Sequence, residues 1–211
     1  MMRQKNVDFK IGKKMNNSNI DYYNHNAESF YESSVEADMS EWQNRFLKHI
    51  PAGGRILDAG CGSGRDSKAF IKQGYSVVAF DASREMCKKA SELIGQEVWQ
   101  IRFDEMSFDD EFDGVWACAS LLHVNDKDLP EILKKIHKAL KENGILYASF
   151  KYGEGKRERG ERSFIDFTEE SIKPILIMSG FEVIDSGITS DIRPGRENEK
   201  WTNVIVKKVN H

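Results

Sequence analysis

Seven residues, Asp58-Ala59-Gly60-Cys61-Gly62-Ser63-Gly64, form a glycine-rich segment between a predicted strand over 55–59 and a predicted helix over 65–74. The alternate glycines allow a tight turn and bring the backbone within contact distance of a ligand. Neither reading frame supplies the G-x-G-x-x-G spacing of a dinucleotide-binding loop. Asp58, at the mouth of the loop, would repel a pyrophosphate and suits a cationic group such as an ammonium.

Two further acidic residues follow at the ends of the next predicted strands. Asp81 comes 17 residues after Gly64, where a carboxylate can accept hydrogen bonds from both hydroxyls of a ribose. Asp104 ends the third predicted strand, where it could read the edge of an adenine ring. An ammonium, a ribose and an adenine without phosphates are the recognisable parts of S-adenosylmethionine.

The elements that position these residues alternate between short apolar runs and amphipathic runs. Strands are predicted over 55–59, 75–81, 97–104, 112–120, 144–152, 181–189 and 201–209, and helices over 65–74, 83–95, 126–144 and 168–180. This alternation predicts a mostly parallel sheet covered by helices on both faces, with ligands at the carboxyl ends of the strands. The last strand follows a short loop containing Pro194-Gly195, so it is expected to run antiparallel.

The remaining segments are interpreted from composition. Residues 1–17 are expected to form a flexible basic leader, and 18–211 a single domain whose first part, 18–50, is a cap of two helices. Residues 151–162 carry five basic and three acidic side chains together with glycines, which favours a mobile, solvated loop.

Composition excludes several classes of protein. The 211 residues carry a net charge of −3 and are 39% hydrophobic, and no apolar run is long enough to span a membrane. The three cysteines lack metal-binding spacing, and the N-terminus lacks the apolar core of a secretory signal, so a cytoplasmic location is expected. The mild acidity argues against broad electrostatic binding to nucleic acid.

At these residues the chain resembles the class I S-adenosylmethionine-dependent methyltransferases, over roughly residues 40–210. The matching pieces are ILDAGCGSG, VVAFDAS, the Asp104-Glu105-Met106 turn, FDGVWACASLLHV and LKENGILYASF. The resemblance implies a Rossmann-like α/β fold with a seven-stranded sheet in the order 3-2-1-4-5-7-6, strand seven being antiparallel. The stretch CGSGRDS is similar to the tellurite-resistance-type branch of the family.

The resemblance also implies which residues bind the cofactor: Asp58, Ala59, Gly60, Cys61, Gly62, Gly64, Arg65, Asp81, Ala82, Ser83, Asp104, Glu105, Met106, Cys118 and Ala119. Asp58 would orient the methionine amino group, and Cys118 would contact the methionine part. Arg65 would either pair with the methionine carboxylate or form a surface salt bridge with Asp66 or Glu85.

His123 follows the fourth predicted strand and is the candidate general base for an acceptor that must lose a proton. Its ordinary pKa of about 6.5 suits that role, and the alternative is that it only shapes the pocket wall. The candidate acceptor-binding residues are Tyr23, Tyr31, Lys151, Tyr152, Arg193 and Trp201. The alternative for Tyr23 and Tyr31 is ordinary core packing. For Lys151 and Tyr152 it is a charged surface, and for Arg193 and Trp201 it is a plain hairpin.

The expected function is metal-independent, in-line transfer of a methyl group to an oxygen, nitrogen or sulfur of a small molecule. No Asn/Asp-Pro-Pro-Tyr/Phe motif follows the fourth strand, which departs from the amino-methylating enzymes of this fold. A tRNA-modifying methyltransferase of the wobble-uridine type and a non-catalytic cofactor-binding regulator are the alternatives. A monomer or homodimer without membrane contact is expected, and nucleic acid is the alternative partner.

Overall fold

The computed structural model describes residues 17–193 and 195–209. Within them the strands are β1 (Arg55–Ala59), β2 (Ser76–Asp81), β3 (Trp99–Gln100), β4 (Phe112–Ala117), β5 (Leu140–Lys151), β6 (Gly155–Arg159), β7 (Arg162–Asp166), β8 (Phe181–Ser190) and β9 (Lys200–Lys208). Seven of them form one sheet in the order β3-β2-β1-β4-β5-β9-β8. Strands β1 to β5 pair in parallel, whereas β9 runs antiparallel to both β5 and β8. The predicted order and the antiparallel last strand are therefore confirmed.

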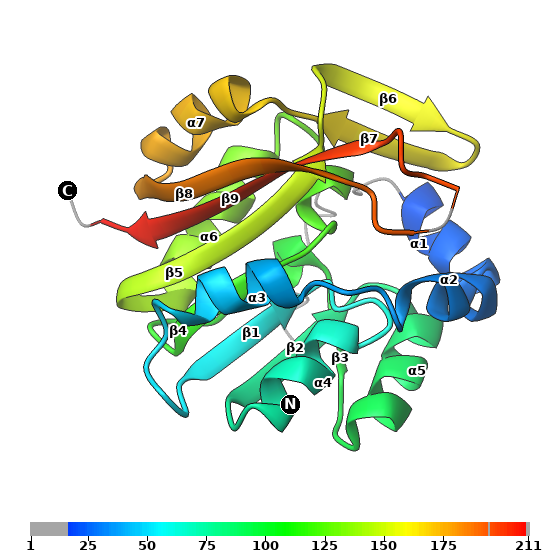
Figure 1. The fold of residues 1–211 in the computed structure, drawn as a ribbon, viewed down its shortest axis with the longest axis horizontal. Coiled ribbons are helices and arrows are strands. Elements are labelled where there is room, and N and C mark those ends of the chain that lie inside the picture. Colours follow the sequence, from blue (N-terminus) through cyan, green and yellow to red (C-terminus); the bar gives the residue numbers. More distant parts are fainter. Residues whose placement is uncertain (1–16, 194, 210–211) are drawn as a thin grey trace, which may run out of the picture.

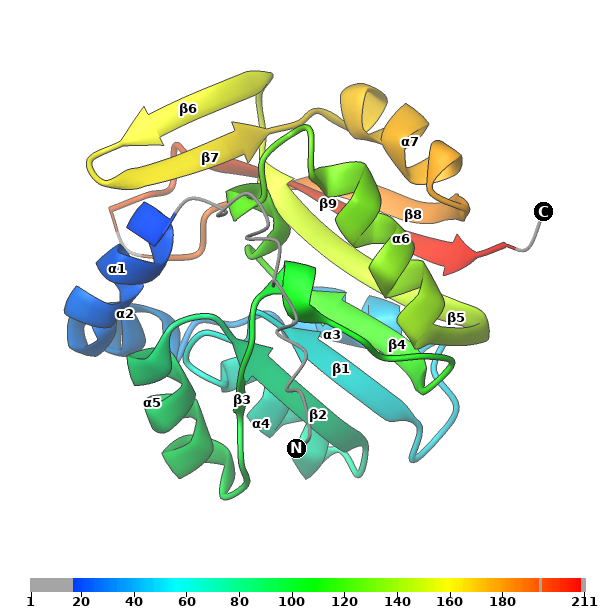
Figure 2. The ribbon, with the colours of Figure 1, turned by 180° about the vertical axis from the view of Figure 1, so that it is seen from behind.

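Helices cover both faces of this sheet (Figures 1 and 2). They are α1 (Asn17–His25), α2 (Ala27–Ser34), α3 (Ser40–Leu47), α4 (Arg65–Lys72), α5 (Arg84–Ile94), α6 (Leu129–Ala139) and α7 (Glu169–Met178), with 3-10 turns at Phe103–Glu105 and Leu121–His123. On one face Phe46 of α3 and Phe70 of α4 pack around Trp116 of β4. On the other face α6 and α7 bury an aliphatic core that includes Leu133 and Leu176. Burial on both faces explains why the central strands are almost continuously apolar.

The fifth strand begins earlier than the sequence predicts. A helix over 126–144 was expected to stop at Asn143-Gly144, but α6 ends at Ala139 and β5 starts at the next residue. Leu140 is fully buried and pairs with Phe112 of β4, and the register shifts before Gly114. This pairing overrides the helical pattern of the sequence. The third strand is also shorter than the predicted 97–104, because only Trp99 and Gln100 pair with β2.

The segment predicted as a mobile charged loop is instead a β-hairpin. Strands β6 and β7 pair antiparallel from Gly155↔Asp166 to Arg159↔Arg162 and form a second, two-stranded sheet. Cross-strand contacts explain its order: the Arg157 guanidinium lies 5.4 Å from the centre of the Phe164 ring and its Nε lies 2.9 Å from an Asp166 carboxylate oxygen.

The N-terminal cap contains three short helices rather than the predicted two. Helix α1 is joined to the hairpin through Asn19, whose amide donates to the Ser163 carbonyl (3.2 Å) and accepts from the Ser163 backbone N–H (2.9 Å). Near its other end, Asn24 accepts a hydrogen bond from the Ser83 hydroxyl (2.8 Å). Helix α1 therefore connects the hairpin to the start of α5. The predicted leader lies outside the described residues, except for Asn17, which begins α1.

No helix in the described part of the chain is both long enough and apolar enough to cross a membrane.

The close approach of α3 to β4 depends on Gly114. A Cβ at this position would lie 2.5 Å from Phe46 Cζ and 2.7 Å from Ile50 Cδ1. Gly114→Ala should therefore lower the free energy of unfolding by about 1–3 kcal/mol, because an overpacked core strains its neighbours. Urea denaturation checks this, and the penalty should shrink in a Phe46→Leu background, where the facing side chain is smaller. Unchanged stability of Gly114→Ala would contradict this packing.

Candidate functional site

A cavity of about 300 Å³ opens at the carboxyl ends of the central strands. Its wall combines the glycine-rich loop after β1, the ends of β2 and β4, helices α1 and α2, the hairpin and the segment between β8 and β9. Parallel sheets bind ligands at this edge, so the cavity lies where the strand pattern predicts.

The glycine-rich loop adopts backbone conformations that side chains rarely allow. Gly60, Gly62 and Gly64 have φ angles of +78°, +53° and +79°. A Cβ at Gly60 would lie 2.5 Å from the Cβ of Ser120, whose hydroxyl donates to the carbonyl oxygen of Ala59 (2.7 Å). Glycine at position 60 thus permits both the left-handed turn and the close packing of the loop against the end of β4.

Asp81 is held at the end of β2 by backbone N–H groups. Its carboxylate accepts hydrogen bonds from Gly62 (3.0 Å) and Ser83 (2.8 Å) and lies in the cavity wall. Burial nevertheless raises its pKa above the ordinary value. The carboxylate retains acceptor capacity for hydroxyl donors from a ligand.

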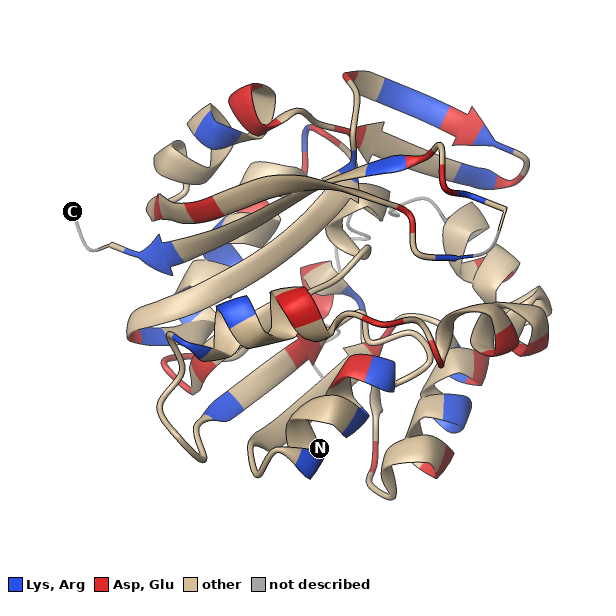
Figure 3. Ribbon diagram, viewed as in Figure 1, with Lys and Arg blue, Asp and Glu red and all other residues tan. Residues whose placement is uncertain are grey.

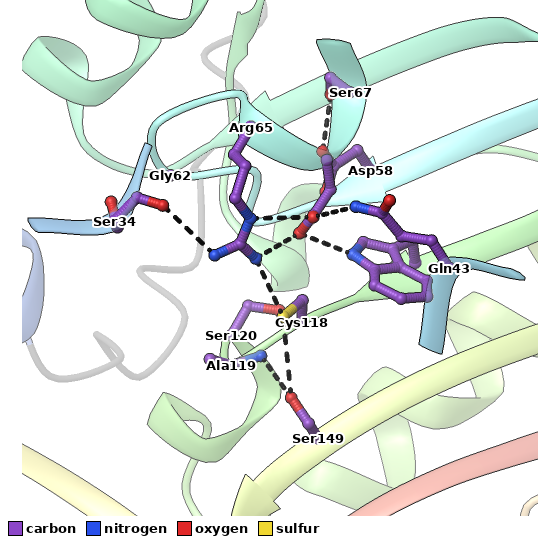
Figure 4. Close-up of polar contacts among 12 residues, drawn as sticks. Ser34, Gln43, Asp58, Gly62, Arg65, Ser67, Cys118, Ala119, Ser120 and Ser149 are labelled. Carbon is purple, nitrogen blue, oxygen red and sulfur yellow. Dashed lines mark hydrogen bonds and ion pairs between the residues drawn. The ribbon is translucent and has the colours of Figure 1, made fainter. Parts of the chain in front are cut away.

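Two other buried carboxylates, Asp58 near the end of β1 and Asp66 at the start of α4, differ in their partners. Asp66 accepts from Arg65 (2.7 Å), Gln43 (2.7 Å) and Trp116 Nε1 (2.9 Å). Although burial opposes ionisation, the charge and hydrogen bonds of Arg65 hold the pKa of Asp66 below its ordinary value. Asp66 is therefore a satisfied anion. Figure 4 shows the side chains of two of its partners, Arg65 and Gln43, directed toward one another.

Asp58 has far less support. It is only 2% exposed, accepts hydrogen bonds from the hydroxyl (2.6 Å) and the backbone N–H of Ser67, and forms no ion pair within residues 17–193 and 195–209. Burial and the negative charge of Asp66 raise its pKa. Because Asp58 lines the cavity, a cationic ligand group placed there would stabilise its ionised form.

The structure shows one of the two alternatives that the sequence leaves open for Arg65, the ion pair with Asp66. This ion pair is buried rather than on the surface, while Glu85 pairs with Lys88. The guanidinium also reaches the carbonyl of Ser34 (3.4 Å) and remains in the cavity wall. The ion pair therefore leaves room for a second, ligand-binding role.

The structure does not bring every predicted cofactor residue to the cavity. Cys61, Ala82, Ser83, Cys118 and Ala119 line it together with the residues above, but Ala59, Gly64, Asp104, Glu105 and Met106 do not. After the short β3, Ile101, Arg102 and Phe103 form the wall, and Asp104 pairs with Arg102 (3.0 Å) with its side chain 39% exposed.

His123 and Tyr23 form a hydrogen-bonded pair on the acceptor side of the cavity. His123 Nδ1 lies 3.1 Å from the Ser163 carbonyl, which can only accept, so Nδ1 carries the proton. Nε2 therefore accepts from the Tyr23 hydroxyl at 2.9 Å. Burial, together with the positive charge of Arg162, lowers the pKa of His123 to about 4. The ordinary pKa assumed from the sequence is thus wrong, and the imidazole is neutral at pH 7.

Three of the remaining acceptor-side candidates meet at one carboxylate. Asp191, 4% exposed, accepts from Lys151 (2.9 Å), Arg193 (2.6 Å) and Trp201 Nε1 (3.1 Å), and all four residues line the cavity. Lys151 also pairs with Glu199 (2.6 Å). These cations are already neutralised within the protein.

Tyr31 and Tyr152 lie outside the cavity lining. Tyr31 packs under the Lys89 ammonium, 5.0 Å from its ring centre, and Tyr152 is 44% exposed.

The sequence interpretation missed the cavity residues of the hairpin, because it treated that segment as a loop. Arg157, Arg159, Arg162 and Phe164 all line the cavity. Their spacing by two on each strand was the available signal, since alternate residues of a strand share a face.

Residues 56–144 match the model of a methyltransferase domain. The chain is 31% identical over 139 residues to the putative methyltransferase YqeM of Bacillus subtilis, covering 61% of this chain and 56% of the relative. It is also 31% identical over 128 residues to the 2-methyl-6-phytyl-1,4-hydroquinone methyltransferase of Synechocystis, covering 57% of this chain and 39% of that protein. The chain thus spans well under two thirds of either relative.

A solved structure extends the likeness over almost the whole chain. The 1,6-didemethyltoxoflavin-N1-methyltransferase of Burkholderia thailandensis, with bound 1,6-didemethyltoxoflavin and S-adenosylhomocysteine, superposes with a TM-score of 0.76 at 21% identity. The match covers 97% of this chain and 94% of that one. The chain therefore shares the fold of this methyltransferase, and residues 56–144 match a methyltransferase domain. The tellurite-resistance-type branch is not specifically supported.

The state of His123 can be tested directly. Nitrogen-detected NMR titration should show the Nδ1–H tautomer and an imidazole that stays neutral from pH 8 down to about pH 5, since its pKa is about 4. Arg162→Met should raise this pKa, because it removes a nearby positive charge, while burial keeps it below the ordinary value. A titration midpoint near pH 6.5 in the wild-type protein would contradict the burial and hydrogen bonding described here.

Proposed function

We propose that this chain is an S-adenosylmethionine-dependent methyltransferase that methylates an oxygen, nitrogen or sulfur of a small molecule by metal-independent in-line displacement. The domain is proposed to extend over residues 18–211, with 18–50 as its cap. A cytoplasmic location and a monomeric or homodimeric state stay predictions.

The observation that carries the proposal is the buried, incompletely paired Asp58 at the cavity wall. A carboxylate in this environment is costly to ionise unless a cation approaches it, and the ammonium of the methionine moiety is such a cation. Asp81 lies across the glycine-rich loop with acceptor capacity for the ribose hydroxyls. The half-buried Ile101 and Phe103 offer an apolar wall for the adenine.

When bound, S-adenosylmethionine supplies a methyl group already activated on a sulfonium. The protein then has to align the acceptor and exclude water from the site. Residues of helix α1 and of the hairpin line this side of the cavity. A proton leaving the acceptor can reach His123 Nε2 only through the Tyr23 hydroxyl that occupies it, so Tyr23 is the group that would contact the acceptor.

A small acceptor is supported by the dimensions of the site. A cavity of about 300 Å³ has to hold the cofactor as well as the acceptor, and small-molecule pockets are commonly about 300–1,000 Å³. The structural neighbour from Burkholderia thailandensis is named for a small acceptor. Among the described residues, no group of three or more His, Cys, Asp or Glu side chains could hold a metal ion. No feature of the described residues specifically favours the RNA-modifying or the regulatory alternative.

Asp81→Ala should weaken binding of S-adenosylhomocysteine by about 2–4 kcal/mol, because it removes a carboxylate that accepts hydrogen bonds from the ribose. Isothermal titration calorimetry measures this. Asp104→Ala is the matched control: it also removes one carboxylate, but from outside the cavity lining, and should leave the affinity nearly unchanged. Equal affinities of wild type and Asp81→Ala would remove the ribose role.

The affinity for S-adenosylhomocysteine should fall as the pH is lowered through the raised pKa of Asp58. Protonation removes the charge that pairs with the ligand ammonium, so the ionised form is the one that binds. Asp58→Asn should bind weakly at all pH values and lose this part of the pH dependence. Calorimetry between pH 5 and pH 8 measures the pH dependence of the wild type and the affinity of Asp58→Asn. If Asp58→Asn binds as tightly as the wild type, Asp58 does not bind the ligand ammonium.

A further inference from the structure

Arg162 is a buried cation without a carboxylate partner. It begins β7, retains only 9% of its surface exposed, and lines the cavity. Its Nε is buried without a hydrogen-bond partner. Within residues 17–193 and 195–209 it forms no ion pair. An unpaired buried charge is costly, so the site is one that an anion would complete.

Most of the neighbouring cations differ from Arg162 because they have an acidic partner. Lys151 pairs with Asp191 and Glu199, Arg193 with Asp191, and Arg159 with Glu199. Figure 3 shows this concentration of basic and acidic positions on the hairpin and on the segment between β8 and β9. The cluster is therefore largely neutralised. Arg196 also lines the cavity without an ion pair among the described residues, but it is only partly buried, so the buried uncompensated charge is that of Arg162.

Aromatic rings hold the Arg162 guanidinium in place. It lies 4.3 Å from the ring centre of Tyr22 and 5.3 Å from that of Phe164. Stacking of this kind restricts the side chain while leaving its N–H groups directed along the plane of the fork. Phe164 also lies against His123, with ring centres 5.1 Å apart.

The same guanidinium lies next to the Tyr23–His123 pair. It interacts with the Tyr23 hydroxyl, and its charge reaches His123. The cavity wall here also contains the flat surfaces of Tyr23, Phe164 and Trp201. A guanidinium beside aromatic rings suits a planar molecule that carries one acidic group.

We propose that Arg162 binds the carboxylate of a small aromatic acid and thereby orients this acceptor against the Tyr23–His123 pair. The proposal rests on the proposed methyltransferase function and adds the substrate class. The fork of a guanidinium matches the two oxygens of a carboxylate. The cavity-lining rings of Tyr23, Phe164 and Trp201 contact the flat remainder of the molecule. Arg162 binds and positions the acceptor, and the proton pathway begins at Tyr23.

The test uses the full chain saturated with S-adenosylhomocysteine and titrates benzoate and 4-hydroxybenzoate by calorimetry. Their neutral isosteres, benzamide and 4-hydroxybenzamide, are titrated in parallel. The acids should bind at least tenfold more tightly than the amides, because only a carboxylate completes the charge of Arg162. In the NMR titration of His123, bound benzoate should raise the pKa by offsetting the positive charge.

Arg162→Met should weaken binding of the acids about 10- to 100-fold and leave binding of the amides unchanged. Arg162→Lys should recover only part of the loss, because it keeps the charge but not the fork. Lys156→Met is the matched control, because it removes a cation from the same hairpin. The Lys156 ammonium pairs with Asp126, and the residue lies outside the cavity lining. It should bind the acids as the wild type does.

Two outcomes would overturn the proposal: no acid of the panel binds the wild-type complex, or acid and amide bind equally in the wild type. These comparisons within the wild type stand even if an Arg162 variant fails to fold, which thermal denaturation reveals. Failure of S-adenosylhomocysteine to bind the wild type would instead remove the proposed function. The two failures are thus distinguishable.

Discussion

The site depends on two buried carboxylates, of which Asp66 forms an ion pair and Asp58 forms none among the described residues. Asp66 receives hydrogen bonds from α3, from α4 and from the indole of Trp116 in β4. These bonds fix the start of α4 and hold Arg65 in the cavity wall. Asp58 has no such ion pair, so a cationic ligand group would stabilise its ionised form. Of these two adjacent carboxylates, Asp66 therefore serves packing and Asp58 is available to a ligand. The cost of burying charge thus favours the cavity wall beside Asp58 as the position of the proposed cofactor.

The sheet and the cofactor loop could be predicted because their signals are local. Apolar runs, glycine spacing and acids at strand ends require no knowledge of distant partners. Asp58 and Asp81 were placed correctly at the cavity by this reasoning. Asp104 was not, because its position depends on how soon β3 stops pairing, and only Trp99 and Gln100 pair with β2.

The acceptor side could not be predicted in the same way. The order of the hairpin depends on contacts with residues far away in the sequence, such as Asn19, which is 144 positions from Ser163. Lys151 and its partner Asp191 are separated by 40 positions. When these distant partners are unknown, a run of charged residues resembles a solvated loop. Composition alone therefore predicted a loop where the structure has the hairpin. Helix α6 ends earlier than predicted for the same reason, because Leu140 joins the sheet by pairing with the distant Phe112.

Helix α1 is attached at two points by two asparagine side chains, Asn19 to the hairpin and Asn24 to the start of α5. The first attachment lies beside the proposed acceptor position and the second beside the proposed cofactor position. One nine-residue helix therefore contributes to the wall next to both positions. A displacement of α1 would change the surroundings of both at once, so the two proposed positions are mechanically coupled through this helix.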